Sequence, residues 1–283
     1  METDDGAMKP PVQPVLRVSG LSKSYRRKSA VWQRTGMVVV AASEVDVEIF
    51  AGQTLALVGS SGSGKSTVAR CVMRLEKPDT GQISLEGTDI ARLDSRALRS
   101  FRPKLQMVFQ DAATSMNPRF TAAEVIEEPL RIQKQADKSA RRTRAEELMQ
   151  EVGLSPRWAD RSAMDFSGGQ RQRLAIARAL ALKPALLVLD EALSGLDLST
   201  EAQIANLLVD LQAAHSLAYL LISHDLALVA RLADTIAVMA RGRIVEQGPA
   251  DEVIASAGHP ETRALIESAR AAQANLFALG AAL

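Results

Sequence analysis

Residues 59–67 read Gly59-Ser60-Ser61-Gly62-Ser63-Gly64-Lys65-Ser66-Thr67, which is the spacing G-x-x-x-x-G-K-[ST] of a phosphate-binding loop. Glycine tolerates the dihedral angles that let successive backbone N–H groups converge on phosphate oxygens. Lys65 adds a positive charge for the β- and γ-phosphates, and the Ser66 hydroxyl can ligate Mg²⁺. We therefore predict that this loop binds the phosphates of a nucleotide.

The residues on either side supply the structural context that such a loop needs. Thr54 to Val58 read as a fully buried strand that leads into the glycines. Apolar residues then recur at helical spacing after the loop: Val68, Cys71, Val72 and Leu75. The N-terminus of that helix would add its dipole to the phosphate site. This context argues against the alternative, a glycine–serine loop with an incidental lysine.

Further along the chain, predicted strands alternate with predicted helices. The strands are expected at residues 15–18, 45–49, 105–109, 186–189 and 217–222, with a hairpin at 236–239 and 243–246. Thr200-Glu201-Ala202-Gln203 resembles a capping box that opens a helix. The alternation predicts an α/β fold with a mainly parallel sheet and right-handed crossovers.

The chain divides into a main domain, residues 15–257, and two flanking segments. Residues 1–14 are acidic and then proline-rich without an apolar run, so we expect a flexible tail rather than a signal peptide. Residues 111–168 are charged, helical in pattern and lack buried-strand runs, which predicts a helical subdomain inserted in the main domain. Residues 258–283 are expected to form a helical extension whose role the sequence leaves open.

Composition narrows the function classes. A net charge of +1 over 283 residues offers no electrostatic basis for binding nucleic acid. The single cysteine, Cys71, excludes an internal disulfide and fits a reducing compartment. Because no run approaches about 18 apolar residues, no membrane span is predicted, and we expect a cytosolic chain that meets a membrane only through a partner.

An adjacent acidic pair, Asp190-Glu191, ends the predicted strand at 186–189. Asp190 can hold Mg²⁺, and Glu191 can orient or deprotonate an attacking water. Acidic residues at a strand end are often merely solvated. The phosphate loop earlier in the chain favours the catalytic interpretation.

Three further positions carry weaker signals. His224 follows the strand at 217–222 and would lie beside the nucleotide, although a histidine there can simply precede a helix that Asp225 caps. Gln110 closes the strand at 105–109 and can reach Mg²⁺ or water, yet a glutamine at a strand end is usually a surface residue. Tyr25 can stack on adenine, with Trp32 as the competing aromatic and packing on the sheet as the alternative role for either.

The segment Phe166-Ser167-Gly168-Gly169-Gln170 precedes a helix that we predict to begin near Arg171. A serine and two glycines at a helix N-terminus form an anion site. Since the chain already has a phosphate site, a second one makes sense if it serves a neighbouring molecule. The alternative is a plain helix cap.

Taken together, these motifs resemble those of ATP-binding cassette (ABC) ATPases, over roughly residues 15–253. In that family's terms, Gly59–Thr67 resembles Walker A, Gln110 the Q-loop, Phe166–Gln170 the signature, Leu186–Glu191 Walker B, Ser194-Gly195-Leu196-Asp197 the D-loop and His224 the switch histidine. The resemblance implies a RecA-like P-loop NTPase core with a mainly parallel sheet, an antiparallel β subdomain and the inserted helical subdomain.

The resemblance also implies roles for individual residues. Catalysis would fall to Lys65, Gln110, Glu191 and His224. ATP would be bound by Tyr25, residues 59–67, Gln110 and Asp190, and Mg²⁺ by Ser66, Gln110 and Asp190. In a head-to-tail dimer, the ATP held by one subunit would also contact Ser167, Gly168, Gly169, Gln170 and Asp197 of the other.

A finer resemblance is to the ATPase subunits of peptide and nickel importers. Its basis is Val108-Phe109-Gln110-Asp111, Ser115-Met116-Asn117-Pro118-Arg119, the Phe-Ser-Gly-Gly-Gln-Arg-Gln-Arg segment from Phe166, and His259-Pro260-x-Thr262-Arg263-Ala264-Leu265. The chain departs from the usual pattern with Phe166 for leucine, Ala192 for proline and Gly195 for alanine, none of which removes a phosphate or metal contact. Since Cys71 is the only cysteine, we expect no iron–sulfur centre.

This resemblance implies an importer subunit, peripheral on the cytoplasmic face of the inner membrane. Its partners would be a second ABC ATPase subunit, identical or different, two membrane permease subunits and, indirectly, a solute-binding protein. A groove near Gln110 and the helical insert would receive a short permease helix. The alternatives are an exporter subunit, a non-transport ABC ATPase, and a regulator that binds without hydrolysis. The sequence does not identify the transported solute.

Overall fold

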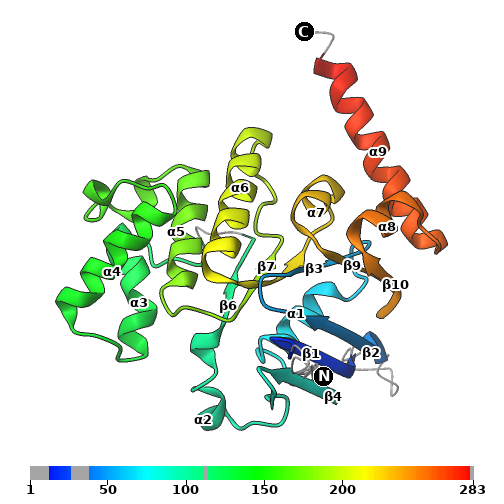
Figure 1. The fold of residues 1–283 in the computed structure, drawn as a ribbon, viewed down its shortest axis with the longest axis horizontal. Coiled ribbons are helices and arrows are strands. Elements are labelled where there is room, and N and C mark those ends of the chain that lie inside the picture. Colours follow the sequence, from blue (N-terminus) through cyan, green and yellow to red (C-terminus); the bar gives the residue numbers. More distant parts are fainter. Residues whose placement is uncertain (1–12, 27–37, 111–113, 281–283) are drawn as a thin grey trace, which may run out of the picture.

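A computed structural model describes residues 13–26, 38–110 and 114–280, and it is built on a central sheet (Figure 1). The strand order in the described residues is β10-β9-β3-β8-β7-β6. The strands are β3 (Thr54–Val58), β6 (Leu105–Val108), β7 (Leu186–Asp190), β8 (Ala218–Ile222), β9 (Thr235–Ala240) and β10 (Arg243–Pro249). All neighbours pair in parallel except the β9–β10 hairpin, which is antiparallel as predicted.

A second, antiparallel sheet packs beside the first, with the order β2-β1-β4-β5. It comprises β1 (Leu16–Arg26), β2 (Val38–Ile49), β4 (Thr80–Leu85) and β5 (Thr88–Asp89). In β2, Val45, Val47 and Ile49 are buried whereas Asp46 and Glu48 are exposed, so the predicted half-buried strand is confirmed. The α/β fold class with an antiparallel β subdomain is therefore confirmed.

The two faces of the central sheet bury separate cores. Leu55 and Leu57 of β3 pack with the antiparallel sheet and α1 (Lys65–Val72). Ala56 and Val58 face the helices on the other side, α5 (Gly168–Leu180), α6 (Leu198–His215) and α7 (Leu226–Leu232). Because successive side chains of a strand point to opposite faces, β3 must be apolar throughout, and all five of its residues are buried.

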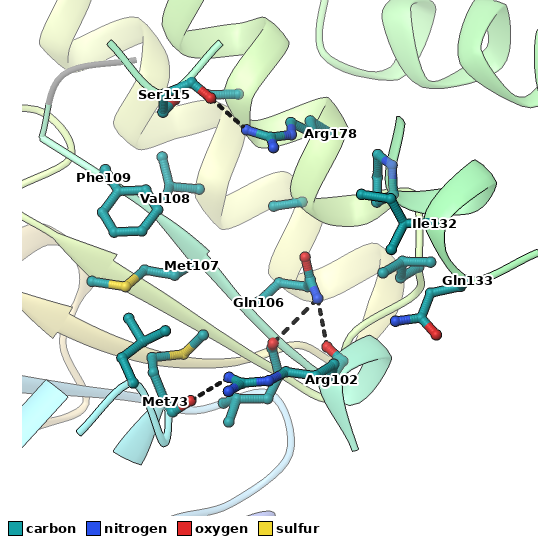
Figure 2. A pocket seen from close by; sticks show the side chains of 16 residues that line it. Met73, Arg102, Gln106, Met107, Val108, Phe109, Ser115, Ile132, Gln133 and Arg178 are labelled. Atoms are coloured by element: carbon teal, nitrogen blue, oxygen red, sulfur yellow. Dashed lines mark hydrogen bonds between the residues drawn. The ribbon is translucent and has the colours of Figure 1, made fainter. Parts of the chain in front are cut away.

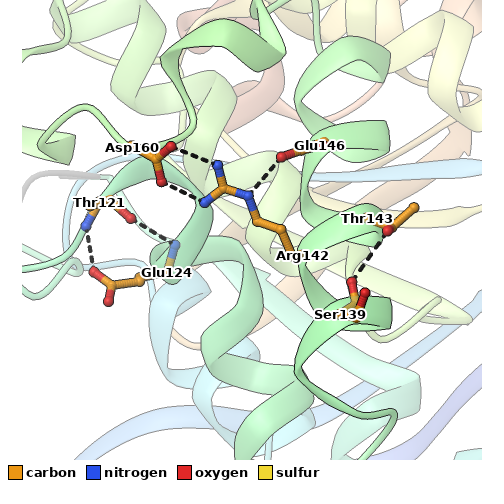
Figure 3. Close-up of polar contacts among 7 residues, drawn as sticks. All are labelled: Thr121, Glu124, Ser139, Arg142, Thr143, Glu146 and Asp160. Atoms are coloured by element: carbon orange, nitrogen blue, oxygen red, sulfur yellow. Dashed lines mark hydrogen bonds and ion pairs between the residues drawn. The ribbon is translucent and has the colours of Figure 1, made fainter.

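The helical region between β6 and β7 contains α3 (Ala122–Ile132) and α4 (Lys138–Glu151), which pack with α5. Thr121 and Glu124 form a reciprocal capping box at the start of α3 (Figure 3). Arg142 of α4 donates to both carboxylate oxygens of Asp160 at 2.7 and 3.0 Å and to Glu146 at 2.7 Å. These bonds attach α4 to the turn that follows it.

The turn between α4 and α5 explains why Phe166 replaces leucine. Two short 3₁₀ segments lie here, Pro156–Trp158 and Ala163–Asp165. The Phe166 ring is buried, meets Trp158 edge-on with 6.1 Å between ring centroids, and lies 5.2 Å from the Arg161 guanidinium. Edge-to-face and cation–π contacts of this kind require an aromatic ring.

Several predicted boundaries were wrong. Helix α6 begins at Leu198 rather than at Thr200, because Asp197 is its N-cap and accepts from the Thr200 backbone at 2.9 Å. Helix α5 begins at Gly168 rather than near Arg171. Leu75 lies beyond the end of α1 and is 53% exposed. Strand β6 ends at Val108, which leaves Phe109 45% exposed.

Three remaining helices lie at turns and at the C-terminal end: α2 (Ser95–Leu98), α8 (Ala250–Ala255) and α9 (Pro260–Gly280). A short 3₁₀ segment, Arg102–Lys104, precedes β6. Figure 1 shows α9 extending away from the central sheet. In the parts of the chain that the structure describes, no helix is both long and apolar enough to cross a membrane.

The His259-Pro260 segment begins α9 and is bound to β10. The Glu246 carboxylate accepts from the backbone N–H groups of Gly258 at 2.7 Å and His259 at 3.0 Å. Pro260 occupies the first helical position, where its missing N–H costs no hydrogen bond. Glu246 therefore satisfies backbone donors that would otherwise be unpaired ahead of the helix.

We predict that Glu246→Ala loosens the start of α9. Losing a carboxylate that accepts two backbone N–H groups at a helix start is expected to cost about 1 kcal/mol locally. Hydrogen exchange of the amides at residues 258–264 should then speed up about fivefold. Glu267→Ala, an exposed glutamate on α9 itself, is the matched control, and equal exchange in both variants would contradict the anchoring role.

Candidate functional site

The phosphate-binding loop, residues 59–67, joins the end of β3 to the start of α1. Gly59 and Gly64 have φ values of +147° and +112°, which side chains rarely adopt. A Cβ atom at Gly59 would also collide with the carbonyl oxygen of Met239, and one at Gly64 with that of Ala41. Conformation and close packing therefore both demand glycine at these two positions.

Lys65 lies folded into this loop and is 6% exposed. Its Nζ atom donates to the carbonyl oxygens of Gly59 at 2.8 Å and Ser60 at 2.9 Å. Burial lowers the pKa of Lys65, while the nearby Glu191 and Asp190 carboxylates raise it. The loop thus surrounds a buried cation, the arrangement expected for binding phosphate oxygens.

Asp190 ends β7 next to the loop. Burial, followed by the charge of Glu191, raises the pKa of Asp190, and a hydrogen bond with Ser66 lowers it. A hydroxyl and a carboxylate are hard oxygen donors of the kind that Mg²⁺ binds, and a divalent cation would offset the repulsion between the two carboxylates. The residues present therefore fit Mg²⁺.

Protein ligands alone would not complete that Mg²⁺ site. Within the described ranges, no group of three or more His, Cys, Asp or Glu residues could hold a metal ion. Mg²⁺ in nucleotide sites usually takes one or two protein ligands and completes its shell with phosphates and water. Gln110, the third predicted ligand, lies exposed two residues beyond β6, the strand that pairs with β7.

Glu191 and His224 face one another at the ends of β7 and β8. His224 Nδ1 lies 3.7 Å from Glu191 Oε1, and both residues line a cavity of about 140 Å³. Asp225 caps α7, as the alternative role for this segment supposed, by accepting from Ala227 at 2.7 Å. The cap uses Asp225 and leaves the His224 ring directed at Glu191.

The backbone of Glu191 is unusual for a residue with a side chain. Its φ of +48° lies in the left-handed region. The Glu191 N–H donates to the Ile222 carbonyl of β8 at 3.0 Å, and the Glu191 carbonyl accepts from Ser194 at 3.0 Å. Neighbouring backbone thus holds this strained conformation, which is common at functional positions.

Residues 167–170 form a helix cap at an exposed position. Ser167 Oγ accepts from the Gln170 backbone at 3.3 Å, and the Gln170 side chain accepts from the Ser167 backbone at 3.0 Å. A Cβ atom at Gly169 would collide with the Thr200 side chain, so this cap packs on the start of α6, next to Asp197. No hydrogen bond joins it to residues 59–67 in the described part of the chain.

Tyr25 lies on β1, opposite Val39 of β2. Its ring is partly exposed, and it forms a hydrogen bond with Thr67 at the end of the phosphate loop. The Tyr25 hydroxyl also donates to Glu76, a residue that the sequence analysis did not single out. Trp32, the competing aromatic, lies outside the described residues.

A groove of about 330 Å³ lies between β6, α3 and α5 (Figure 2). Leu75, Phe109 and Ile132 line it, and all three are exposed apolar residues. Arg178 closes one end by donating to the Ser115 carbonyl at 2.9 Å and pairing with Glu128 at 2.7 Å. Sequence reasoning placed a groove near Gln110 but missed the wall formed by Met73 and Leu75, because α1 was predicted to continue through them.

The family described as "ABC transporter" matches residues 42–194. A probable peptide ABC transporter ATP-binding protein, y4tS of Sinorhizobium fredii, is 49% identical over 90% of this chain and 72% of its own length. A putative peptide import ATP-binding protein of Brucella ovis is 43% identical over 90% of this chain and 78% of its own. The glutathione import ATP-binding protein GsiA of Salmonella choleraesuis is 44% identical over 90% of this chain and 41% of its own.

Solved structures agree on the fold. The ATP-binding cassette MJ0796, in a dimeric post-hydrolysis state bound to ADP and Pi, is 28% identical with a TM-score of 0.72, covering 83% of this chain and 98% of that one. CbiO1 from Clostridium perfringens, part of the ABC transporter complex cbiONQ, is 25% identical with a TM-score of 0.75, covering 86% and 91%.

The raised pKa of Asp190 predicts a trade-off between stability and binding. A carboxyl group whose pKa is higher in the folded than in the unfolded state lowers the stability of the fold at pH values above the folded-state pKa. This loss of stability disappears as the pH falls below the unfolded-state pKa. Asp190→Asn should therefore raise the melting temperature of the nucleotide-free protein at pH 7 by a few degrees, about 1 kcal/mol after solvent screening, and should change it little near pH 3.

The same Asp190→Asn variant should lose the thermal stabilisation that ATP and Mg²⁺ confer on the wild type. Calorimetric melts with and without nucleotide at both pH values measure the two effects. A variant less stable than the wild type at pH 7 would contradict the assigned electrostatic cost.

Proposed function

This chain belongs to the ABC transporter family and is an ATPase, and from that premise we propose that it powers the import of peptides or a related solute. The observation that carries the proposal is the meeting of Lys65, Asp190, Glu191 and His224 where parallel strands β3, β7 and β8 end. The names of the relatives, which refer to peptide and glutathione import, favour peptides over nickel as the solute.

Each group at this edge has a distinct task in the proposed hydrolysis. Lys65 and the backbone N–H groups of residues 59–67 bind and orient the β- and γ-phosphates of ATP. Ser66 and Asp190, with Gln110 beyond the end of the neighbouring strand β6, would hold Mg²⁺, which neutralises charge on the phosphate oxygens when bound. Glu191 orients the attacking water and accepts its proton, and His224 keeps the Glu191 carboxylate in place.

We propose that the working enzyme is a head-to-tail dimer. Ser167 and Gly168 are exposed at the N-terminus of α5, a position suited to an anion, and the Ser167 side chain caps this helix. In the dimer they would contact the γ-phosphate held by the other subunit, and Asp197 would lie at the same interface. The MJ0796 cassette, which is dimeric in its solved structures, supports a dimer.

We further propose that the groove in Figure 2 receives a short helix from a membrane permease. Leu75, Phe109 and Ile132 are exposed apolar side chains that line the same groove, and covering them with an apolar partner removes this surface from water. Gln110 follows directly on Phe109, so changes at the nucleotide site can reach this groove. Such docking would place the chain on the cytoplasmic face of the inner membrane, alongside two permeases and a solute-binding protein.

Glu191→Gln should bind ATP with unchanged affinity but hydrolyse it at least about 100-fold more slowly, because the amide cannot accept the proton of the attacking water. ATP-loaded dimer should accumulate, which size-exclusion chromatography with light scattering would measure. Lys65→Ala is the matched control that should fail to bind ATP at all. Normal turnover by Glu191→Gln would refute the assignment.

Ile132→Asp should separate docking from catalysis. A charge in the groove disfavours an apolar partner, so ATP-driven uptake of a labelled dipeptide into proteoliposomes containing the full transporter should fall about tenfold. ATP hydrolysis by the isolated chain should not change. Val209→Asp, at an exposed apolar position on α6, is the control. Equal uptake by both variants would count against the groove as the docking site.

A further inference from the structure

The Tyr25 side chain is tethered to the helix that follows the phosphate loop. Its hydroxyl donates to Glu76 Oε2, while Glu76 Oε1 lies 3.6 Å from the guanidinium of Arg70 on α1. The Glu76 backbone N–H also donates to the Arg70 carbonyl at 3.1 Å. One carboxylate therefore connects the aromatic residue of β1 to the helix that begins at Lys65.

One side of the Tyr25 ring is occupied by a cation. Lys23 Nζ lies 5.7 Å from the ring centroid, within the range of a cation–π contact. Lys23 is itself held, because it donates to Asp79 at 3.0 Å and to the Lys77 carbonyl at 2.9 Å. Lys23 lies over the ring and Glu76 binds the hydroxyl, yet the residue as a whole remains 37% exposed, which leaves surface that a ligand can contact.

These contacts hold the end of β1 in place at neutral pH. Asp79 accepts from the Ser24 N–H at 2.8 Å and the Ser24 hydroxyl at 2.9 Å, and these bonds together with Lys23 lower the pKa of Asp79. Burial and Glu76 raise the pKa of Tyr25, which keeps its phenol protonated as a donor. At neutral pH Asp79 is therefore charged and the Tyr25 hydroxyl is protonated, and these are the forms that the hydrogen bonds of the tether require.

The tethered ring also lies close to the phosphate loop. Thr67, the last residue of that loop, forms a hydrogen bond with Tyr25. Val39, opposite Tyr25, is two residues from Ala41, whose carbonyl packs against Gly64. The ring is thus beside the first turn of α1, within reach of the base of a nucleotide whose phosphates lie at Lys65.

We propose that Glu76 is a positioning residue for base recognition, fixing the Tyr25 ring so that its open face stacks on the adenine of ATP. The proposal rests on the proposed function, in which this chain binds ATP, and on the adenine-stacking role that the sequence predicts for Tyr25. A free tyrosine side chain loses rotamer entropy when it stacks, and a tether made before binding removes much of that loss. Glu76 contributes to affinity without contacting the nucleotide.

The test compares ATP with tripolyphosphate, a probe that lacks the base, by calorimetric titration of the full chain. Tyr25→Phe keeps the ring and loses the tether, and Glu76→Ala removes the acceptor. Each variant should weaken ATP binding about three- to tenfold. The double variant should weaken it no more than either single variant, because both substitutions remove the same hydrogen bond. The affinity for tripolyphosphate should not change. Glu76→Gln, which keeps an acceptor oxygen, should retain most of the affinity.

Glu86→Ala is the matched control, because it removes a surface glutamate paired with Lys104 at 2.7 Å on the far end of the same sheet. Wild-type ATP affinity in Tyr25→Phe and Glu76→Ala, with a loss in Tyr25→Ala, would overturn the positioning role and leave stacking intact. Wild-type affinity in Tyr25→Ala as well would remove Tyr25 from the proposed site. A parallel loss of tripolyphosphate binding would show that the tether supports the loop rather than the base, and would also overturn the proposal.

Discussion

Parallel pairing of the buried strands β3, β7 and β8 is the constraint on which the site depends. In a parallel sheet all strands end at the same edge, so the residues that follow each of them come together whatever their separation in sequence. Residues 59–67, Asp190-Glu191 and His224 each follow one of these strands. The register is set by apolar side chains on both faces of the sheet, and a slip by one residue would exchange the two cores.

Several residues that we assign to the chemistry are held in states that cost folding free energy. Lys65 and Asp190 are both partly desolvated, and their pKa values move in opposite directions, toward the neutral form of each. Glu191 adds a left-handed backbone held by Ile222 and Ser194. Such costs persist because the surrounding sheet is strongly stabilised by apolar burial, and a bound nucleotide with its cation offsets part of them.

The antiparallel sheet and the helical region are each linked to the site at the edge of the central sheet, but in different ways. The antiparallel sheet carries Tyr25 to the start of α1, where Glu76 and Lys23 hold its ring. The helical region presents an apolar groove directly after β6, whose neighbour β7 ends in Asp190. Leu75 in that groove is adjacent to Glu76, so the groove and the aromatic residue share one short stretch of backbone beyond α1.

What the sequence determined by itself was local: the glycine loop, the apolar strands, the acidic pair and the order of the motifs. These patterns depend on dihedral freedom and hydrophobic periodicity, which neighbouring residues set. Tertiary structure alone decided that Leu75 leaves α1 to line the groove and that Glu246 binds the start of α9. It alone paired Tyr25 with Glu76, which is 51 residues away. Such contacts are set by how two sheets and a helix pack together, and no local pattern records that geometry.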